Sequence, residues 1–470
     1  MSDLVNNILA SCEAYKNSIA ISGGESQVTY GQLANQIDTW KGLFEKRGNP
    51  QRIGFSLANS PQYVAALYGA IAAGGTPFLM DPGMPEESKK VLVETLGLDL
   101  IVSATKSNPE WFKQKQEVGE GFEFSVQANA ATEYEIKNDT ALCRFTSGTS
   151  GVPKCLEFSH NAVLQAARTW ADAHQYNSKD TVLCLAAFFN GLAFNTSFSS
   201  VFLSGATLLL YPGLPAAPMV VRYASENSAT RLVAFPIFYQ QAATLTSVSL
   251  RSSGVTYAYS AASRLQDKTR IAFQEAHGLS IVDYYGLAEV GPVTYEPNGQ
   301  ALIGTGIALP GCDIRIRDGI LQVKTPYRAS SYLNHPGKLE ARIDEDGFLT
   351  TEDYARIEDG RLFMTGRADG IINVAGQKFD PSDTIEALRM IPGLKDAFVF
   401  GADAGDGTHD VCAVVSCTIE MQQVEIRKML TDKLEAYKIP SQILVVDEIP
   451  RNGAGKPYTS EIRKLFKAKE

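Results

Sequence analysis

The feature that most constrains the fold is an alternation of apolar runs and amphipathic segments, which continues along the chain until about Gly304. Residues 26–30 predict a strand, and residues 32–44 predict a helix because their apolar side chains recur with helical spacing. Strands that alternate with helices are typical of parallel sheets covered by helices. We therefore expect an α/β fold with a large N-terminal domain of parallel-type sheets and flanking helices. Further strands are predicted at 52–56, 98–102, 140–145, 181–185, 206–211 and 231–235, and a helix at 61–73.

From Gly304 onward the predicted elements are shorter and mostly strands, which indicates a small β subdomain. After Asp369 helices and strands alternate again, enough to form a domain of their own. We therefore expect an N-terminal domain at 1–368 and a small, mobile α+β domain at 369–470. The strands of the β subdomain are predicted at 313–317, 320–324 and 361–364; those of the tail are predicted at 397–400 and 411–417, with helices at 382–390 and 421–434.

Composition excludes several classes of protein. The net charge of −9 argues against a nucleic-acid-binding surface. Glycines and a proline interrupt the most apolar window, residues 63–80, so we expect a buried core segment rather than a membrane span. The start of the chain lacks the pattern of a signal peptide, and the seven cysteines lack C-x-x-C spacing. These features predict free thiols in a reducing cytoplasm, and they give no indication of oligomeric state.

The segment 146–154 is rich in glycine and hydroxyl side chains and ends in a lysine. Glycines let backbone N–H groups turn toward an anion, hydroxyls add donors, and the lysine adds a positive charge. We therefore predict a polyphosphate-binding loop; the alternative is a flexible linker. The Walker pattern is not met because Pro153 precedes Lys154, which disfavours an ordinary nucleotide kinase. The candidate phosphate-binding residues are Thr146, Ser147, Gly148, Thr149, Ser150, Gly151 and Lys154.

This loop resembles the phosphate loop of the adenylate-forming superfamily, which includes acyl- and aryl-CoA synthetases, adenylation domains and luciferase. Four later segments resemble motifs of that family in the family's order, at 285–289, 351–353, 365–369 and 450–456. The resemblance spans nearly the whole chain. It implies an ATP-dependent ligase that activates a carboxylic acid as an acyl-adenylate and transfers the acyl group to a thiol.

The resemblance also implies roles for single residues. Glu289 would bind Mg²⁺, and Lys456 would bridge the acyl carboxylate and the α-phosphate, which makes these two the candidate catalytic residues. A carboxylate with phosphate oxygens suits the hard Mg²⁺ ion. The remaining assignments are Asp353 and Arg367 for the ribose, Tyr285, Gly286 and Ala261 for the adenine side, Asp369 as the hinge, and Gly376 on the thiol or pantetheine side.

Simpler interpretations remain open for some of these residues. Asp353 could be a turn acid, Arg367 a surface charge, and the glycines before Lys456 an exposed turn. The chain also departs from the family pattern. Ala288 stands where a hydroxyl is usual, and the adenine-side segment 259–263 is not rich in glycine. Asn373 replaces a lysine and Ile385 a glutamate. These departures leave a non-catalytic acyl- or nucleotide-binding relative as an alternative.

The acyl pocket is expected where the chain resembles the family's pocket motif, around Phe189, Asn190 and Phe194, together with Phe235. Residues 185–211 contain no Asp or Glu that could pair with a substrate ammonium group. An α-amino acid substrate is therefore disfavoured, and we expect a neutral apolar or aromatic acid. The resemblance implies CoA as the thiol, with the phosphopantetheine of an acyl-carrier protein as the alternative; luciferase-type oxidation is a more distant one.

Overall fold

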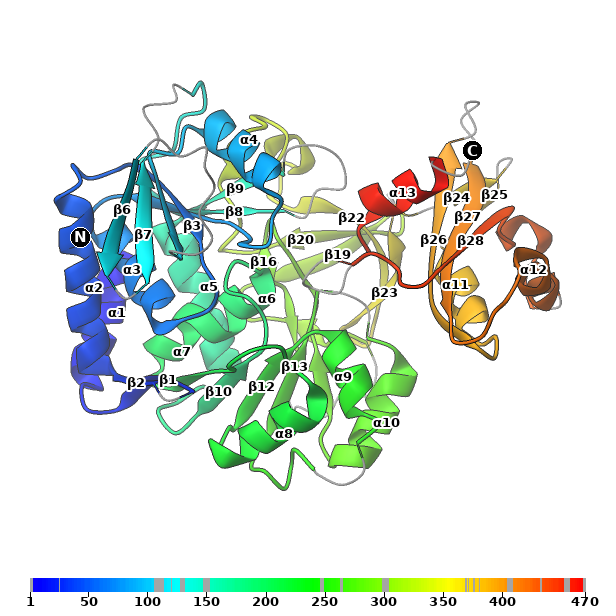
Figure 1. Ribbon diagram of the computed structural model, residues 1–470, viewed down its shortest axis with the longest axis horizontal. Helices are drawn as coiled ribbons and strands as arrows, with labels where there is room; N and C mark the ends of the chain where they lie inside the picture. The colour runs from blue at the N-terminus through cyan, green and yellow to red at the C-terminus, as the bar shows by residue number, and fades with distance from the viewer. Residues whose placement is uncertain are drawn as a thin grey trace. The chain divides into compact units, whose positions relative to one another are not determined.

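The computed structural model describes residues 3–24, 26–104, 114–119, 121–126, 132–146, 153–245, 249–262, 265–297, 304–367, 370, 372–374, 377–379, 381–403, 409–431, 433–451 and 457–467. The chain divides into two compact units (Figure 1). The large unit comprises Met1–Ile314, Val323–Leu349 and Asp359–Leu362, and the small unit comprises Arg315–Gln322, Thr350–Glu358 and Phe363–Glu470. The expected domain boundary after residue 368 remains a prediction.

A seven-stranded sheet in the large unit has the order β14-β13-β12-β10-β11-β1-β2. The strands from β14 to β1 pair in parallel, and β2 pairs with β1 in the antiparallel sense. The carboxyl ends of β10, β12, β13 and β14 therefore lie along one edge, where ligands commonly bind in α/β proteins. The bounds are β1 (Ile19–Gly23), β2 (Ser26–Thr29), β10 (Thr181–Cys184), β11 (Thr207–Leu210), β12 (Arg231–Ala234), β13 (Tyr257–Ser260) and β14 (Ile281–Asp283).

The second large sheet of this unit has eight strands in the order β21-β9-β8-β4-β3-β5-β7-β6. Its centre, β8-β4-β3-β5, is parallel, whereas β9, β21, β7 and β6 add antiparallel pairs at its two sides. The sheet is therefore mixed rather than purely parallel. The bounds are β3 (Arg52–Ser56), β4 (Thr76–Leu79), β5 (Leu100–Ala104), β6 (Gln114–Gly119), β7 (Phe122–Val126), β8 (Thr140–Phe145), β9 (Cys155–Ser159) and β21 (Ser331–Tyr332).

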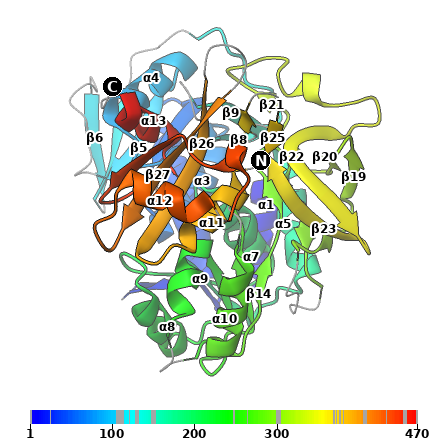
Figure 2. The same ribbon diagram turned by 90° about the vertical axis from the view of Figure 1, so that its right-hand side faces the viewer.

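Helices cover these sheets with their apolar faces. α2 begins at a capping box made by Thr29 and Gln32, and Gly69 of α3 lies so close to Trp40 that an added Cβ would approach its Cβ to 2.6 Å. α8, α9 and α10 lie beside β12 and β13 (Figure 1) and share one core with them; Figure 2 shows the same three helices together with β14. The bounds are α1 (Asp3–Ala14), α2 (Tyr30–Glu45), α3 (Pro61–Ala72), α4 (Glu86–Leu96), α5 (His160–Ala173), α6 (Gly191–Ala193), α7 (Ser199–Leu203), α8 (Ala217–Glu226), α9 (Pro236–Ala242) and α10 (Asp267–His277).

Short strands follow these elements in both units. In the large unit, β15 (Gly286–Leu287) pairs with β16 (Gly291–Pro292), and β17 (Thr294–Tyr295) pairs with β18 (Ile307–Ala308). The next four strands are mostly in the small unit and have the order β23-β22-β20-β19. They confirm the strands predicted for the β subdomain. Their bounds are β19 (Asp313–Arg317), β20 (Ile320–Lys324), β22 (Leu349–Glu358) and β23 (Arg361–Arg367).

The C-terminal part of the small unit is a three-stranded sheet with helices on both faces. Alternate residues of the strands face opposite ways, which gives two cores. One core contains Val399, Ala413 and Ile443 with side chains of α11 and α12; the other contains Phe400, Val414 and Leu444 with Ile462 of α13. The bounds are β24 (Ile372–Val374), β25 (Gln377–Phe379), β26 (Leu394–Asp403), β27 (His409–Cys417), β28 (Gln442–Val446), α11 (Ser382–Arg389), α12 (Gln423–Thr431) and α13 (Thr459–Lys467).

Several expectations from the sequence are confirmed. The fold is α/β with a large N-terminal part and a small α+β part, and the helical stripe of Leu33, Ile37, Trp40 and Phe44 is buried. All seven cysteines are free thiols, and six of them are buried. In the part of the chain that the structure describes, every helix is too short or too polar to cross a bilayer.

Candidate active site

The predicted phosphate loop connects the two strands of the β8–β9 hairpin. Thr146 directly follows β8 and donates its N–H to the carbonyl of Lys154 at 3.0 Å, and Cys155 then begins β9. Asn334 holds the end of the loop: its Oδ1 accepts from the Cys155 N–H at 2.8 Å, and its Nδ2 donates to the Pro153 carbonyl at 3.0 Å. The structure therefore fixes both ends of the loop, whereas Ser147, Gly148, Thr149, Ser150 and Gly151 lie outside the described residues.

Glu289 and Lys154 both contact the same tyrosine, Tyr332. Glu289 lies between β15 and β16, with a side chain that is 13% exposed. Its Oε1 accepts a hydrogen bond from the Tyr332 hydroxyl and lies 3.7 Å from Arg342 Nη1. On the ring of the same tyrosine, Lys154 Nζ lies 5.3 Å from the centroid. The candidate metal ligand and the candidate phosphate-binding cation thus belong to one cluster.

This cluster fits a magnesium ion shared with a polyphosphate. Mg²⁺ is usually held by one or two carboxylates together with phosphate oxygens and water. Among the described residues, no group of three or more His, Cys, Asp and Glu side chains could enclose a metal ion without such help. The contacts of Glu289 with Tyr332 and Arg342 both involve Oε1, and the nearby Lys154 suits phosphate oxygens. Glu289 would hold the ion, and Lys154 would bind phosphate.

The adenine-side residues follow neighbouring strands of the seven-stranded sheet. Ala261 directly follows β13 and is buried, and Tyr285 follows β14 and is also buried. The Tyr284 N–H donates to the Ser260 carbonyl at 3.1 Å, which joins the two strand ends. Thr294 fixes the Tyr285 backbone by accepting its N–H at 2.8 Å. At Gly286 an added Cβ would lie 2.8 Å from the Gly291 carbonyl oxygen, so this pairing requires glycine.

The candidate acyl-pocket residues lie at the same edge of the sheet. Phe189 and Asn190 follow β10, and Phe235 follows β12, so these residues, Ala261 and Tyr285 all succeed parallel strands that are neighbours. Asn190 caps the short helix α6, because its Oδ1 accepts the Leu192 N–H at 2.9 Å. Phe194 is buried and its ring stacks on Phe198 with centroids 5.4 Å apart.

The sequence reasoning missed Arg144, which also contacts the acyl-pocket segment. Arg144 lies on β8 and is only 5% exposed. The centre of its guanidinium group lies 5.1 Å from the centroid of the Phe194 ring. The signal was present, since a charged residue within the apolar strand before the phosphate loop is unusual. Its proximity to residue 194 is a tertiary contact, however, that local pattern does not encode.

The other predicted site residues belong to the small unit. Asp353 is buried on β22, and its N–H donates to Thr351 Oγ1 at 3.0 Å, so it is not an exposed turn acid. Arg367 ends β23. Asp369, Gly376 and Lys456 lie outside the described residues. The roles implied for these five residues remain predictions.

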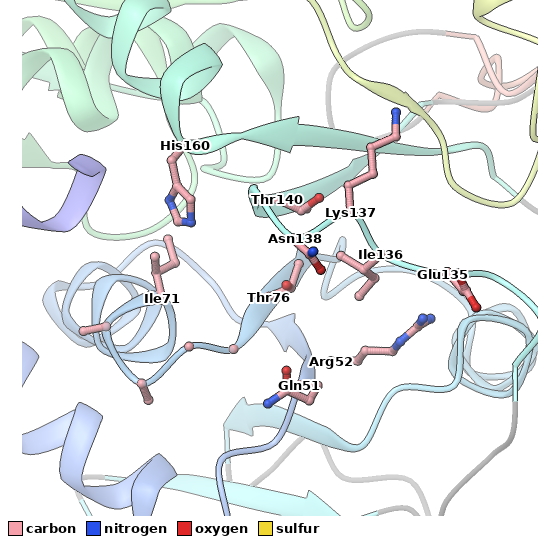
Figure 3. A pocket seen from close by; sticks show the side chains of 14 residues that line it. Gln51, Arg52, Ile71, Thr76, Glu135, Ile136, Lys137, Asn138, Thr140 and His160 are labelled. Carbon is pink, nitrogen blue, oxygen red and sulfur yellow. The ribbon is translucent and has the colours of Figure 1, made fainter. Parts of the chain in front are cut away.

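A polar hollow of about 750 Å³ also opens in the large unit (Figure 3), but it contains none of the predicted site residues. Thr140 lines it at the beginning of β8, whereas the phosphate loop follows the other end of that strand. At about 3.4 Å per residue, the strand separates the two places by roughly 17 Å. Arg52 also lines the hollow (Figure 3), but its guanidinium group already donates to the Leu96 carbonyl at 2.6 Å and to the Tyr134 carbonyl.

Two family models together match most of the chain. The family model described as AMP-binding enzyme matches residues 9–327, and that of the AMP-binding enzyme C-terminal domain matches residues 386–456. The chain is 23% identical to 3-hydroxybenzoate–CoA ligase of Aromatoleum sp. (strain CIB), over 96% of this chain and 94% of that protein.

Two solved structures share the fold over almost the full length. ATP-bound MatB from Rhodopseudomonas palustris superposes with a TM-score of 0.82 at 18% identity, covering 99% of each chain. The o-succinylbenzoate coenzyme A synthetase of Bacillus subtilis, in complex with AMP, gives a TM-score of 0.83 at 19% identity, covering 97% of this chain and 98% of that one.

Proposed function

Since this chain belongs to the AMP-binding enzyme family, we propose that it is an ATP-dependent acid–thiol ligase of the AMP-forming type. It would form an acyl-adenylate from a carboxylic acid and ATP, release pyrophosphate, and transfer the acyl group to a thiol. The main support is the edge of the seven-stranded sheet, where the adenine-side and acyl-pocket residues follow four adjacent parallel strands. An acid and a nucleotide bound at one such edge would meet without further rearrangement of the sheet.

The reaction brings a carboxylate and a triphosphate together, so the site must supply positive charge and oriented donors. Lys154 and the loop that it closes would bind the phosphates, and Tyr285 and Ala261 would form the adenine side. Mg²⁺, when bound to Glu289, would neutralise phosphate charge and polarise the reacting group. The Tyr332 hydroxyl holds the Glu289 carboxylate in place for this task.

The small unit would contribute the remaining groups. Asp353 and Arg367 would bind the ribose, and Lys456 would neutralise the acyl carboxylate and the α-phosphate during adenylation. Asp369 would be the hinge between the orientations for the two half-reactions, and Gly376 would lie on the thiol side. These roles rest on the motifs at 351–353, 365–369 and 450–456.

The acid would have an apolar or aromatic body. Phe189, Phe194 and Phe235 would supply the apolar contacts, and Asn190 would supply a polar one. An α-amino acid is disfavoured because residues 185–211 contain no acid and because the Arg144 charge beside Phe194 would repel an ammonium group. The named relative, a 3-hydroxybenzoate–CoA ligase, supports an aromatic acid.

CoA is the proposed thiol, with a carrier-protein phosphopantetheine as the alternative. The ligase named above supports CoA. The free cysteines fit a reducing compartment such as the cytoplasm. A non-catalytic relative is the other alternative, and the loss of a hydroxyl at Ala288 is the feature that favours it.

The test is acid-dependent exchange of pyrophosphate into ATP, screened over benzoates, medium-chain acids and amino acids. Exchange with an aromatic or aliphatic acid, followed by thioester formation with CoA, would support the proposal. Exchange with an amino acid alone would contradict the assignment of the acid, and no exchange with any acid would favour the non-catalytic alternative.

A further inference from the structure

Arg144 is a buried cation beside the candidate acyl pocket, and the chemistry proposed above gives it no role beyond disfavouring an ammonium group. Its guanidinium centre lies 5.1 Å from the Phe194 ring centroid and 5.6 Å from that of Phe158. Burial lowers the pKa of Arg144 to about 10, which still leaves the group positively charged near neutral pH. The pocket segment therefore faces a full positive charge.

Within the described residues, no carboxylate pairs with the Arg144 side chain, and its Nε atom is buried without a hydrogen-bond partner. The other buried arginines of the described chain also have an Nε atom without a hydrogen-bond partner, but each of them pairs with a carboxylate. Arg231 lies 2.9 Å from Asp180, and Arg270 lies 2.7 Å from Asp283. A buried charge without a partner is strongly unfavourable, and an anion bound beside Arg144 would offset part of that cost.

A second donor for such an anion lies near Arg144. A Cβ at Gly191 would lie 2.6 Å from Arg144 Nη2, so the glycine allows the guanidinium group to approach the acyl-pocket segment closely. The Tyr63 hydroxyl interacts electrostatically with Arg144, is buried, and has no hydrogen-bond partner. The Tyr63 ring packs on Phe188, with centroids 5.3 Å apart, within the same aromatic cluster. Two donors without hydrogen-bond partners, Arg144 Nε and the Tyr63 hydroxyl, thus lie in the neighbourhood of these aromatic rings.

We propose that Arg144 binds a second acidic group of the substrate, so that the enzyme activates dicarboxylic acids with an aromatic or apolar body. This inference rests on the proposed ligase function and names its substrate class. Arginine binds a carboxylate through two parallel N–H bonds, and the Tyr63 hydroxyl would add a third donor. The expectation of a neutral acid came from residues 185–211 and from Phe235, whereas Arg144 belongs to β8 and is not among them.

Two other roles for Arg144 lead to different outcomes. If the guanidinium group bound the carboxylate that reacts, its loss would lower kcat/KM equally for monocarboxylic and dicarboxylic acids. If it only packed on the aromatic rings, its loss would lower the melting temperature and leave substrate preference unchanged.

The test is pyrophosphate exchange by the full-length protein with matched pairs of acids: benzoate with isophthalate, and hexanoate with adipate. The wild type should show a kcat/KM at least about tenfold higher for each dicarboxylate. In Arg144→Met the value for the dicarboxylates should fall about 100-fold and that for the monocarboxylates by less than about threefold. Arg222→Met, which changes an exposed arginine, is the matched control and should change neither value.

Equal losses for both members of a pair, or no preference in the wild type, would overturn the inference while leaving the ligase function intact. If no acid supports exchange, the ligase function fails, and calorimetric titration with isophthalate and adipate decides the inference. Binding to the wild type that is lost in Arg144→Met would support the inference, and equal or absent binding would refute it.

Should Arg144→Met fail to fold, Arg144→Lys is the second variant. It keeps the charge but cannot make two parallel hydrogen bonds, and it should lower the dicarboxylate preference about tenfold. An unchanged preference in Arg144→Lys would also refute the inference.

Discussion

At the scale of single residues, the candidate site depends on how one carboxylate is held. The Tyr332 hydroxyl donates to Oε1 of Glu289, and Arg342 forms an ion pair with the same oxygen. Lys154 Nζ lies over the ring of Tyr332. A carboxylate fixed through one oxygen keeps its other oxygen oriented, which is the arrangement that a metal ligand requires. If Glu289 binds the metal ion, the arrangement separates two functions: Glu289 would supply the charge and Tyr332 the position.

We expect Glu289→Gln to lower adenylation about 100-fold, because the amide keeps the shape but loses the charge that Mg²⁺ needs. Tyr332→Phe should lower it by about tenfold or less, since only the positioning hydrogen bond is lost. The measurement is pyrophosphate exchange as a function of Mg²⁺ concentration. A Glu289→Gln variant with wild-type activity and Mg²⁺ dependence would remove Glu289 from the metal site.

His174 gives a prediction about stability. Burial, and secondarily the nearby Arg231 charge, lower the pKa of His174 to about 3 from the ordinary 6.5. Between these values the unfolded chain binds a proton that the folded chain does not, so stability falls as the pH falls below 6.5. The loss between pH 7 and pH 5 should be about 2 kcal/mol from this residue. Its ring lies among Trp170 and Tyr259, and its Nε2 has no hydrogen-bond partner.

The substitution His174→Phe keeps a ring in this aromatic environment and removes the titrating group. Urea unfolding at pH 7 and pH 5 should then show a stability difference about 2 kcal/mol smaller than in the wild type. His335→Phe, at a half-buried histidine, is the control and should reduce the difference less. An unchanged pH difference in His174→Phe would mean that another group causes the acid sensitivity.

At the scale of elements, the sequence predicted the strand before the phosphate loop and the alternation of the large unit, because both depend on local patterns of apolar side chains. It did not predict that β9 pairs antiparallel with β8 and with β21. Such pairings join residues as far apart in the sequence as 157 and 331, so no local sequence pattern predicts them. Arg144 and Asn334 were missed for the same reason.

Asn334 should support the loop rather than the fold as a whole. Its side chain makes two hydrogen bonds to the backbone at 153 and 155, so Asn334→Ala should cost about 1–3 kcal/mol locally. We expect the KM for ATP to rise about tenfold while the KM for the acid changes little. The control is Asn227→Ala, which removes a side-chain bond to the Tyr223 carbonyl at the end of α8. A similar change of KM for ATP in both variants would show a general loss of stability instead of a loop effect.

At the scale of the whole molecule, the sequence indicated two parts because the pattern of predicted elements changes twice. Short strands begin near Gly304, and helices and strands alternate again after Asp369. The compact units are consistent with a small C-terminal part, but they also place Arg315–Gln322 and Thr350–Glu358 with it. Such interleaving follows from strand pairing within a sheet, which composition does not reveal. The family motifs are stronger evidence for the function than the fold is, because one fold can support many different activities.

Two half-reactions should separate if the small unit supplies its lysine to only one of them. Lys456 would neutralise charge when the carboxylate meets the α-phosphate, and thiol attack on the finished adenylate involves no such meeting. We expect Lys456→Ala to lower adenylation by at least about 1000-fold and to change thioester formation from a supplied acyl-adenylate by less than about tenfold. Single-turnover assays of each half-reaction give both rates. Equal loss in the two assays would contradict this division of labour.

The hinge assignment gives the opposite pattern. If Asp369 is the pivot between two orientations, then Asp369→Pro should trap one of them, because proline fixes φ near −65° and removes the N–H donor. Adenylation should survive within about threefold, and thioester formation should fall by at least about tenfold. Asp369→Ala is the matched control: it removes the same carboxylate but leaves φ free, so both rates should stay near the wild type. A loss in Asp369→Ala as large as in Asp369→Pro would assign the effect to the carboxylate, and wild-type rates in both variants would place the pivot elsewhere in the chain.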